Sequence, residues 1–291
     1  MRDPTGKIRW STKMTPEEML NCTPFPCGIC LHCKINKRRV WTFRLLLEQR
    51  VTEKSCFITL TYSPDFLPKD KSVHKSHLQK YLKRLRKKTT QKIRYYAVGE
   101  YGDKSWRPHY HIALFGLNSE DSKIISSSWK DPKTKQDIGF VQIGDLNKDS
   151  ASYIAGYVIK KLTNKKDERL NGLLPEFMTS SRGKTGGIGL PYIKKLAQRI
   201  NKFKYKENRI ITEIYYNGRL HPLGSYLTKK LAELTDIPEE FYEQKYLDYM
   251  DSIYGNQPDP EDSYWQKQFA DDTKMHSAEV KHNIFKQRRT I

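Results

Sequence analysis

The sequence lacks any apolar run that could cross a membrane. No stretch of its 291 residues approaches the ~18 consecutive apolar residues of a transmembrane helix, and no apolar signal segment follows the N-terminus. Hydrophobic residues make up only 37%, against a usual ~45–50%. Eighteen Tyr, 11 Phe and 5 Trp nevertheless argue against a disordered chain. We therefore expect a folded, water-soluble protein of one large domain or two ordinary ones.

Acidic side chains are also few compared with basic ones. The chain has 33 Asp and Glu against 53 Lys and Arg, which gives a formal net charge of +20. The first hundred residues hold 22 basic and 8 acidic side chains, whereas residues 201–291 hold 14 and 15. A general solubilising charge is the alternative, but it does not require such a gradient. The excess in the first two-thirds indicates a nucleic-acid surface there.

A phosphate-binding loop of the ATPase type is missing as well. Gly183-Lys184-Thr185 resembles its end, but the motif requires a Gly where this chain has Met178. The segment 182–189 is instead expected to be a flexible, basic, Gly-rich loop. The sequence therefore indicates no ATPase or helicase domain.

Cysteines are rare outside one cluster. Four of the five lie within twelve residues, in the spacing C-x4-C-x2-C-x2-C, and the fifth is Cys56. Four thiolates can complete the tetrahedral shell of a structural Zn²⁺. Reduced thiols and an iron–sulfur cluster are the alternatives. The candidate ligands are Cys22, Cys27, Cys30 and Cys33.

Hydrophobic periodicity predicts the element order α-β-α-β-β-β-α up to about residue 162, which suggests an α+β domain on an antiparallel sheet. Ser76 and Gln79 are expected to form a capping box at the start of the second helix. Asn217-Gly218 predicts a tight turn between the last two strands. The expected helices are 35–53, one starting near 76, and 150–162, and the expected strands are 57–62, 93–100, 109–115, 140–143, 209–216 and 219–223.

The motif His109-Tyr110-His111 is the centre of the chemistry. Alternate residues of a strand share one face, so both imidazoles project to the same side. Two surface histidines are the alternative reading of this motif alone. Glu100 ends the preceding strand, and a hairpin would bring its carboxylate to the two histidines. Such a mixed ligand set suits Mg²⁺ or Mn²⁺ acting on phosphate oxygens.

A pair of tyrosines completes the constellation. Tyr153 and Tyr157 are spaced i, i+4 and therefore share one helix face, followed by Lys160 and Lys161. Packing is the usual role of such a pair, but beside the histidines and Glu100 the phenols are candidate nucleophiles for phosphodiester cleavage. Forming a phenolate at neutral pH costs roughly 4 kcal/mol. Either lysine can stabilise that phenolate or the transition state.

FITLTY, VGEYG with RPHYHIALFG, and YIAGYVIKK resemble, in this order, the three motifs of the HUH endonucleases that initiate rolling-circle replication. The segment PCGICLHCKINKRRVWTFRLLLE is similar to the replication initiators of microviruses, especially the gokushovirus branch. The resemblance covers roughly residues 22–165. It implies an α+β fold with a central antiparallel sheet of about five strands flanked by helices. We accordingly divide the chain into a Cys-rich segment at 1–34, an HUH domain at 35–165 and a C-terminal region of open role at 166–291. Because the chain shows no helicase domain, a host helicase and the host replication machinery are expected to separate the DNA strands.

The resemblance implies the roles of individual residues. His109, His111 and Glu100 match the metal ligands, and Tyr157 with Lys160 matches the Tyr-x-x-Lys of single-tyrosine members. Tyr153 matches the added tyrosine of the two-tyrosine group. In such enzymes a tyrosine attacks single-stranded origin DNA, leaving a 5′-phosphotyrosyl link and a 3′-hydroxyl that primes synthesis. The implied location is the cytoplasm of the bacterial host.

Two other functions remain open at this stage. One is a plasmid relaxase or single-strand transposase of the HUH class, and the other is a non-catalytic nucleic-acid-binding module. In each case basic side chains should contact the DNA backbone, and an aromatic ring can stack on an unpaired base. The candidate DNA-binding residues are Lys37, Arg38, Arg39, Lys83, Arg84, Lys87, Trp106 and Arg107.

Overall fold

The structure of the chain is a computed structural model, and it divides into two compact units. One unit consists of Arg38–Lys206 with Ile211–Asp236, and the other of the remaining residues. Nearly all described residues belong to the first unit, and the fold below is that of this unit. The structure describes residues 15, 27–28, 30–102, 105–160, 168–183, 185–202 and 211–235, without the side chains of 158–160.

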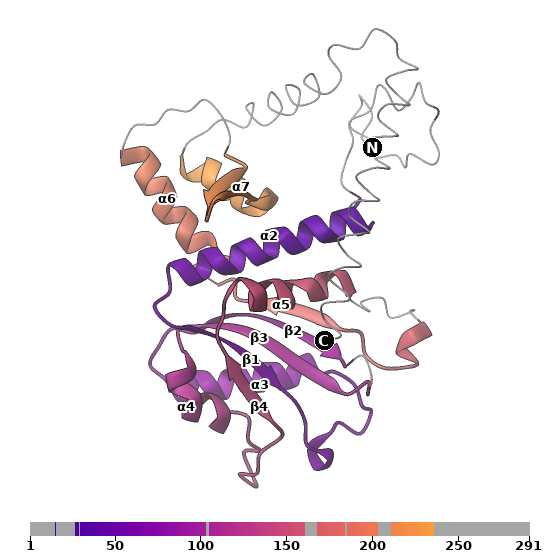
Figure 1. The fold of residues 1–291 in the computed structure, drawn as a ribbon. Coiled ribbons are helices and arrows are strands. Elements are labelled where there is room, and N and C mark those ends of the chain that lie inside the picture. Colours follow the sequence, from indigo (N-terminus) through magenta and orange to yellow (C-terminus); the bar gives the residue numbers. More distant parts are fainter. Residues whose placement is uncertain are drawn as a thin grey trace. The chain divides into compact units, whose positions relative to one another are not determined.

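The predicted α+β fold with a five-stranded antiparallel sheet is confirmed. The strand order is β4-β1-β3-β2-β5 (Figure 1). The strands are β1 (Ser55–Leu60), β2 (Arg94–Tyr101), β3 (Pro108–Phe115), β4 (Val141–Gly144) and β5 (Phe177–Ser180). The helices are α2 (Leu31–Arg50), α3 (Lys75–Lys87), α4 (Ser122–Ser127), α5 (Lys148–Lys160), α6 (Leu190–Lys202) and α7 (Gly224–Leu234), and three short 3₁₀ turns are Pro64–Phe66, Ser119–Asp121 and Glu168–Leu170.

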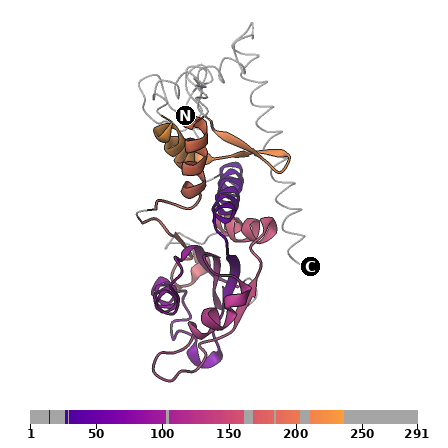
Figure 2. The same ribbon diagram turned by 90° about the vertical axis from the view of Figure 1, so that its left-hand side faces the viewer.

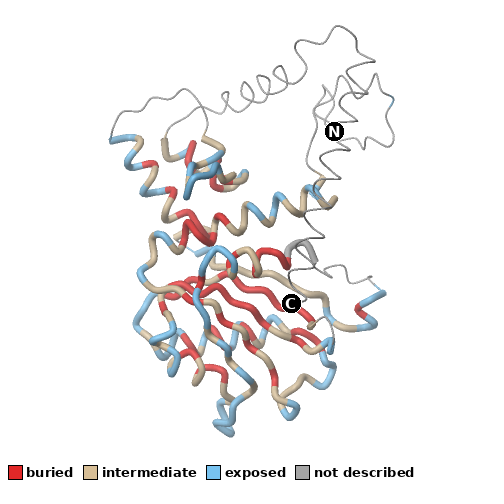
Figure 3. Tube along the Cα trace, viewed as in Figure 1, coloured by how far each residue is buried: buried red, intermediate tan, exposed pale blue. Residues whose placement is uncertain are grey.

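The two faces of the sheet bury different helices because side chains alternate along each strand. On β3, Tyr110 and Ile112 pack with α3 and α4 residues into one core cluster. Ala113 and Phe115 point to the other face and pack with α5 and with α2. Figure 2 shows α3 on one side of the sheet and α5 on the other, and Figure 3 shows the burial concentrated between these layers. His109 and His111 share the α5 face.

A second layer of helices lies on α2. Phe43 and Leu47 of α2 pack with α6 and α7 into a separate core cluster. The expected hairpin is also present here, as strands β6 (Glu213–Tyr216) and β7 (Arg219–Pro222). Asn217 and Gly218 both have positive φ, at 46° and 77°, as a two-residue type I′ turn requires.

Three details differ from the sequence-based expectations. Helix α3 begins at Lys75 after His74, which makes no side-chain cap, so the capping box at Ser76 is wrong. The fifth strand of the sheet lies at Phe177–Ser180, where the sequence pattern indicates no strand. Helix α6 was not expected either.

The Gly-rich segment is held in place, which corrects the expectation of a flexible loop. Arg94 donates from Nη1 to the carbonyl oxygen of Gly186 at 3.1 Å and from Nη2 to that of Gly187 at 3.0 Å. The buried carboxylate of Glu48 accepts hydrogen bonds from Arg94 Nε and, at 2.7 Å, from the backbone N–H of Gly189. This clamp joins α2, β2 and the loop before α6.

No helix within the described part of the chain has both the length and the apolar content needed to span a bilayer.

Candidate active site

The candidate active site is formed where β2, β3 and α5 meet. In the β2–β3 ladder Glu100 stands directly opposite His109, and Val98 stands opposite His111. Glu100 and both histidines therefore project from the same face of the sheet. Helix α5 covers this face and carries Tyr153 and Tyr157 one turn apart. The hairpin and the helix thus bring together the side chains that the motifs singled out.

His111 makes polar contacts with residues of three neighbouring elements. Its Nε2 lies 2.8 Å from Oε1 of Glu100, and its Nδ1 lies 2.9 Å from Oγ1 of Thr59 on β1. Both Glu100 and His111 are buried, with 9% and 7% of their surface exposed. Phe57 stacks on the same imidazole, with ring centroids 5.7 Å apart. The ring is therefore fixed in orientation, with Nε2 facing Glu100 and α5.

The two tyrosine hydroxyls lie beside this nitrogen. The phenol oxygen of Tyr157 is 3.5 Å from His111 Nε2, and it donates a hydrogen bond to the hydroxyl of Tyr153. The Tyr157 ring stacks on His111 with centroids 5.2 Å apart, whereas the Tyr153 ring meets His111 edge-on at 5.4 Å. One helix turn thus brings two phenol hydroxyls to one imidazole–carboxylate pair.

Burial and charge keep the Tyr157 phenol protonated. The pKa of Tyr157 is raised well above its ordinary value of 10, first by burial and then by the negative charge of Glu100 and the neighbouring Tyr153. The pKa of His109 is lowered, mainly by burial and secondarily by His111. A neutral imidazole is the form that binds metals. A cation bound at this site would offset the negative charge of Glu100. It would thereby lower the pKa of the Tyr157 phenol and favour its phenolate form.

His109 packs closely against Gly102, the residue that follows β2. A Cβ placed on Gly102 would come within 3.1 Å of Cε1 of His109. The ligand atoms of Glu100, His109 and His111 do not all come within 4.8 Å of one another; among the described residues such a compact group is formed by three cysteines. The structure thus places Glu100 and His111 in contact and His109 beside them in the ladder.

Those three cysteines are Cys27, Cys30 and Cys33. The sulfurs of Cys27 and Cys33 are 3.8 Å apart, and the N–H of Cys30 donates to Cys27 Sγ at 3.3 Å. None of the three is joined to another described cysteine by a disulfide. Burial, together with the neighbouring thiols, raises the pKa of the Cys33 thiol to about 11. The fourth predicted ligand, Cys22, lies outside the described residues.

The predicted basic residues fall on separate elements. Lys83, Arg84 and Lys87 lie on α3, which covers the sheet face opposite the tyrosines. Lys83 and Lys87 are exposed, whereas Arg84 Nε donates to the carbonyl oxygen of Ser128 at 2.8 Å and so joins α3 to the end of α4. These three cations are not brought to the tyrosine face.

The other predicted basic residues lie on α2, at the end of α5, and in the loop between β2 and β3. On α2, Lys37 and Arg39 are exposed and Arg38 is half-buried. Trp106 is 40% exposed, and Arg107 follows it immediately before β3. Lys160 ends α5, but its side chain, like the whole of Lys161, lies outside the described residues.

Sequence reasoning missed Thr59 and Phe57 as parts of the site. They alternate on β1 and face His111 because the β1–β3 register pairs Thr59 with His111. FITLTY contained the signal, since its alternate residues had to share the face of the histidines once β1 paired with β3. The register itself could not be read from the sequence.

Comparison with known proteins places the chain in a family. The family model of the replication-associated protein ORF2 matches residues 55–162, the span that runs from β1 through α5. Replication-associated protein ORF2 of Spiroplasma virus 4 is 32% identical over 249 residues, which cover 77% of this chain and 71% of that protein. Replication-associated protein VP4 of Bdellovibrio phage phiMH2K is 31% identical over 56% of each chain.

A third relative is replication-associated protein ORF4 of Chlamydia phage 1, which is 25% identical over 75% of this chain and 57% of its own length. No solved structure matches the chain. Glu100, both histidines and both tyrosines lie within the span that the family model matches, whereas the cysteine cluster lies before it. The chain belongs to the ORF2 family of phage replication-associated proteins.

Proposed function

We propose that this protein is a single-stranded DNA nicking and joining enzyme that acts on the phage replication origin to initiate and terminate rolling-circle replication. One observation carries the proposal: two tyrosine hydroxyls meet beside the Nε2 of His111, which in turn contacts Glu100. The names of the relatives support a role in phage replication. An α5 that served packing alone would not need to direct two phenols at a buried imidazole and carboxylate.

In the proposed reaction the phenol oxygen of Tyr157 attacks a phosphodiester phosphorus. The bond from phosphorus to the 3′-oxygen breaks, and that oxygen takes a proton to become a 3′-hydroxyl. The DNA 5′ end stays attached to the tyrosine as a phosphodiester, so no external energy source is needed to reverse the step. Reversal by a 3′-hydroxyl rejoins the strand and restores the phenol.

The residues present fit a divalent cation of the Mg²⁺ or Mn²⁺ type. Glu100, His109 and His111 would hold it, and Thr59 occupies the Nδ1 of His111 so that Nε2 remains for the ion. When bound, such a cation polarises the scissile phosphate and stabilises a phenolate. Asp or Glu with two imidazoles is a donor set that manganese and magnesium accept in phosphate chemistry.

Tyr153 gives the site a second nucleophile. Because its hydroxyl accepts a hydrogen bond from Tyr157, either phenol can reach the same phosphate with little movement of α5. The first tyrosine would hold the 5′ end through one round of synthesis, and the second would cut the regenerated origin. Lys160 and Lys161 follow Tyr157 in the sequence, and their charges would stabilise the transition state.

The remaining proposals concern partners and the cysteines. We assign duplex separation to a host helicase and place the reaction in the host cytoplasm. The exposed cations of α2 and α3 would bind DNA phosphates by charge. Cys27, Cys30 and Cys33 would hold a structural Zn²⁺, with Cys22 as the fourth ligand; three adjacent thiols give a tetrahedral ion three of its four ligands.

Incubation with labelled single-stranded origin DNA and Mn²⁺, followed by denaturing electrophoresis, tests the reaction. Wild type should give a nicked product and a protein–DNA adduct that survives denaturation. Tyr153→Phe with Tyr157→Phe should abolish the adduct, whereas Tyr215→Phe, on an exposed tyrosine of β6, should leave it unchanged. An adduct formed by the doubly substituted protein would refute the nucleophile assignment. Cleavage retained by His109→Ala with His111→Ala in a chelator would refute the metal assignment.

A further inference from the structure

A cavity of about 680 Å³ lies at the loop that connects β2 to β3. Three segments that are distant in sequence line it: the turn after β1, the loop before His109, and the 3₁₀ turn that precedes β5. The first contributes Leu67 and Lys71, the second Trp106 and Arg107, and the third Arg169 and Leu173. Its volume is in the range of small-molecule and nucleotide sites.

The lining combines cationic and apolar side chains. Lys71, Arg107 and Arg169 supply three positive charges, and the lining contains no acidic side chain among the described residues. Arg107 donates from Nη2 to the carbonyl oxygen of Tyr62 at 2.7 Å, which holds its guanidinium in place. One such bond leaves further N–H donors on the guanidinium fork. The cavity therefore suits a group that combines a flat apolar body with an anion.

The indole of Trp106 is presented to solvent by an unusual backbone conformation. Trp106 has φ 53°, and its N–H donates to the carbonyl oxygen of Gly102 at 3.0 Å. A left-handed conformation is uncommon for a bulky residue and is found mostly where a function requires it. Lys71 and Asn171, which also line the cavity, have φ 53° and 44°. Three of the five described non-glycine residues with positive φ thus line one cavity.

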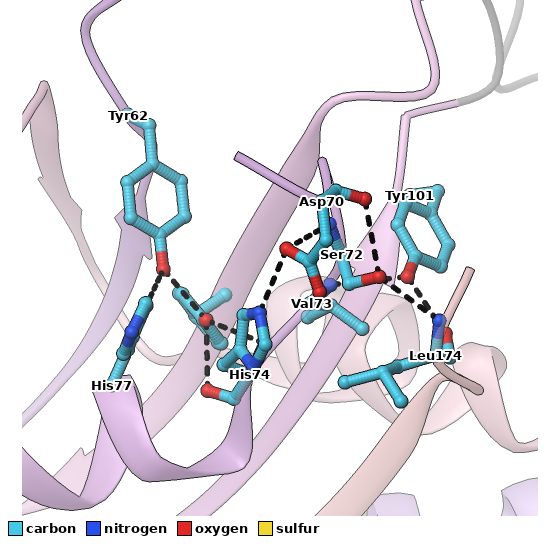
Figure 4. Close-up of polar contacts among 9 residues, drawn as sticks. Tyr62, Asp70, Ser72, Val73, His74, His77, Tyr101 and Leu174 are labelled. Atoms are coloured by element: carbon cyan, nitrogen blue, oxygen red, sulfur yellow. Dashed lines mark hydrogen bonds and ion pairs between the residues drawn. The ribbon is translucent and has the colours of Figure 1, made fainter. Parts of the chain in front are cut away.

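Hydrogen bonds hold the cavity walls together before any ligand arrives. The hydroxyl of Tyr101 accepts from the N–H of Val73 at 3.0 Å and donates to the carbonyl oxygen of Leu174 at 2.7 Å. The N–H of Leu174 donates to Ser72 Oγ at 3.1 Å. Figure 4 shows this network between the segments that carry Lys71 and Leu173. Walls fixed in this way lower the entropy lost on binding.

We propose that this cavity binds one nucleotide of the single-stranded DNA. The base would stack on Trp106 and the adjoining phosphates would contact Arg107 and Arg169. Arg107 precedes the metal-ligand candidate His109 by two residues, so the cavity lies at the same end of the β2–β3 hairpin as His109. Leu67, Leu170 and Leu173 of its lining pack with the core on the α3 face of the sheet, opposite the tyrosines, so the bound nucleotide is distinct from the one at the bond that is cut. The inference rests on the proposed function for its substrate class, single-stranded DNA.

The test measures binding without cleavage, by fluorescence anisotropy of the full chain in a chelator. Two labelled probes are compared: a twelve-nucleotide oligothymidylate, and a twelve-unit abasic strand of equal charge. Trp106→Leu should weaken oligothymidylate binding roughly tenfold and leave the abasic strand nearly unaffected, because only bases stack. Arg169→Gln should weaken both probes alike and reduce the salt slope of log K by about 0.7.

Matched variants separate the cavity from general effects. Phe140→Leu removes an exposed aromatic ring outside the cavity, and Lys133→Gln removes one exposed charge outside it. Both should bind as wild type, and Trp106→Phe should retain most of the preference for bases. Thermal unfolding monitored by circular dichroism checks that each variant folds.

Equal losses on both probes for Trp106→Leu, or no loss on either, would overturn the base contact. An unchanged salt slope for Arg169→Gln would overturn the phosphate contact. The origin-cleavage assay is read separately. Wild type that shows the base preference but forms no adduct would refute the proposed reaction and leave the nucleotide site standing. Adduct formation without the Trp106 effect would refute the site alone.

Discussion

Replacing Glu48 by Gln should destabilise the fold far more than its conservative size suggests. Glu48 is 1% exposed, and its carboxylate accepts hydrogen bonds from Arg94 Nε, from Arg94 Nη2 at 3.4 Å and from Gly189 N–H at 2.7 Å. The substitution leaves the charge of Arg94 buried without its counterion. The Gln side chain has an NH₂ group in place of one carboxylate oxygen. This NH₂ group would face an N–H of Arg94 or Gly189 that now donates to the carboxylate.

The expected cost follows from this geometry. Removing one partner of a buried ion pair destabilises a protein by about 3–5 kcal/mol. For a chain of this size that loss corresponds to a melting temperature lower by roughly 10 °C. Urea unfolding followed by far-ultraviolet circular dichroism measures it. The double variant Glu48→Met with Arg94→Met leaves no unpaired buried charge. Its loss in the free energy of unfolding should therefore be smaller than the sum of the losses of the two single variants, by about 1 kcal/mol or more.

A matched control uses the same substitution at an exposed ion pair. Glu120 lies 3.1 Å from Lys54 on the surface, with 72% of its side chain exposed. Glu120→Gln should lower the free energy of unfolding far less than Glu48→Gln, because exposed ion pairs contribute little to stability. If Glu48→Gln were no more destabilising than Glu120→Gln, the clamp would contribute little and the reasoning would be refuted.

Three further predictions concern other groups. Thr59→Val should raise the Mn²⁺ concentration for half-maximal cleavage about 10–100-fold because it frees Nδ1 of His111, and Thr59→Ser should restore it. The pKa of His77 is lowered below its ordinary 6.5, mainly by burial. Below about pH 6.5 the unfolded chain therefore binds more protons than the folded one, so the contribution of His77 to stability is complete above this pH and falls below it. In His77→Asn the urea midpoint should change less with pH between pH 5 and 7 than in wild type. Metal analysis of the purified chain should find about one zinc, lost in Cys33→Ser and kept in Cys56→Ala; a zinc content unaffected by Cys33→Ser would contradict the site.

The sheet and the arrangement of the site followed largely from local patterns. Alternation in His109-Tyr110-His111 predicts a shared face, and the short connection to Glu100 predicts the hairpin that pairs it with His109. The i, i+4 spacing of Tyr153 and Tyr157 predicts one helix face. Each inference needs only the repeat of a strand or helix. The placement of α5 over the histidines, however, came from the family resemblance.

What the sequence did not reveal depends on contacts between distant segments. The Glu48–Arg94 pair joins residues 46 positions apart, and nothing local marks a Gly-rich loop as fixed by it. The β1–β3 register that brings Thr59 to His111 is likewise non-local. Helix α6 did carry a local signal, since Leu190, Ile193 and Ala197 are buried at helical spacing and Pro191 follows its first residue.

The fifth strand determines where the chain can be truncated without exposing an edge of the sheet. Phe177–Ser180 covers one edge of β2, where Gly99 lets the Phe177 ring approach so closely that a Cβ would lie 2.6 Å from it. A fragment ending near residue 165 would keep every proposed ligand and nucleophile. It would, however, leave without partners those backbone N–H and C=O groups of β2 between Tyr96 and Gly99 that face β5. Open edges of this kind pair with other chains. Such a fragment should aggregate, whereas one that continues through β5 has its edge closed.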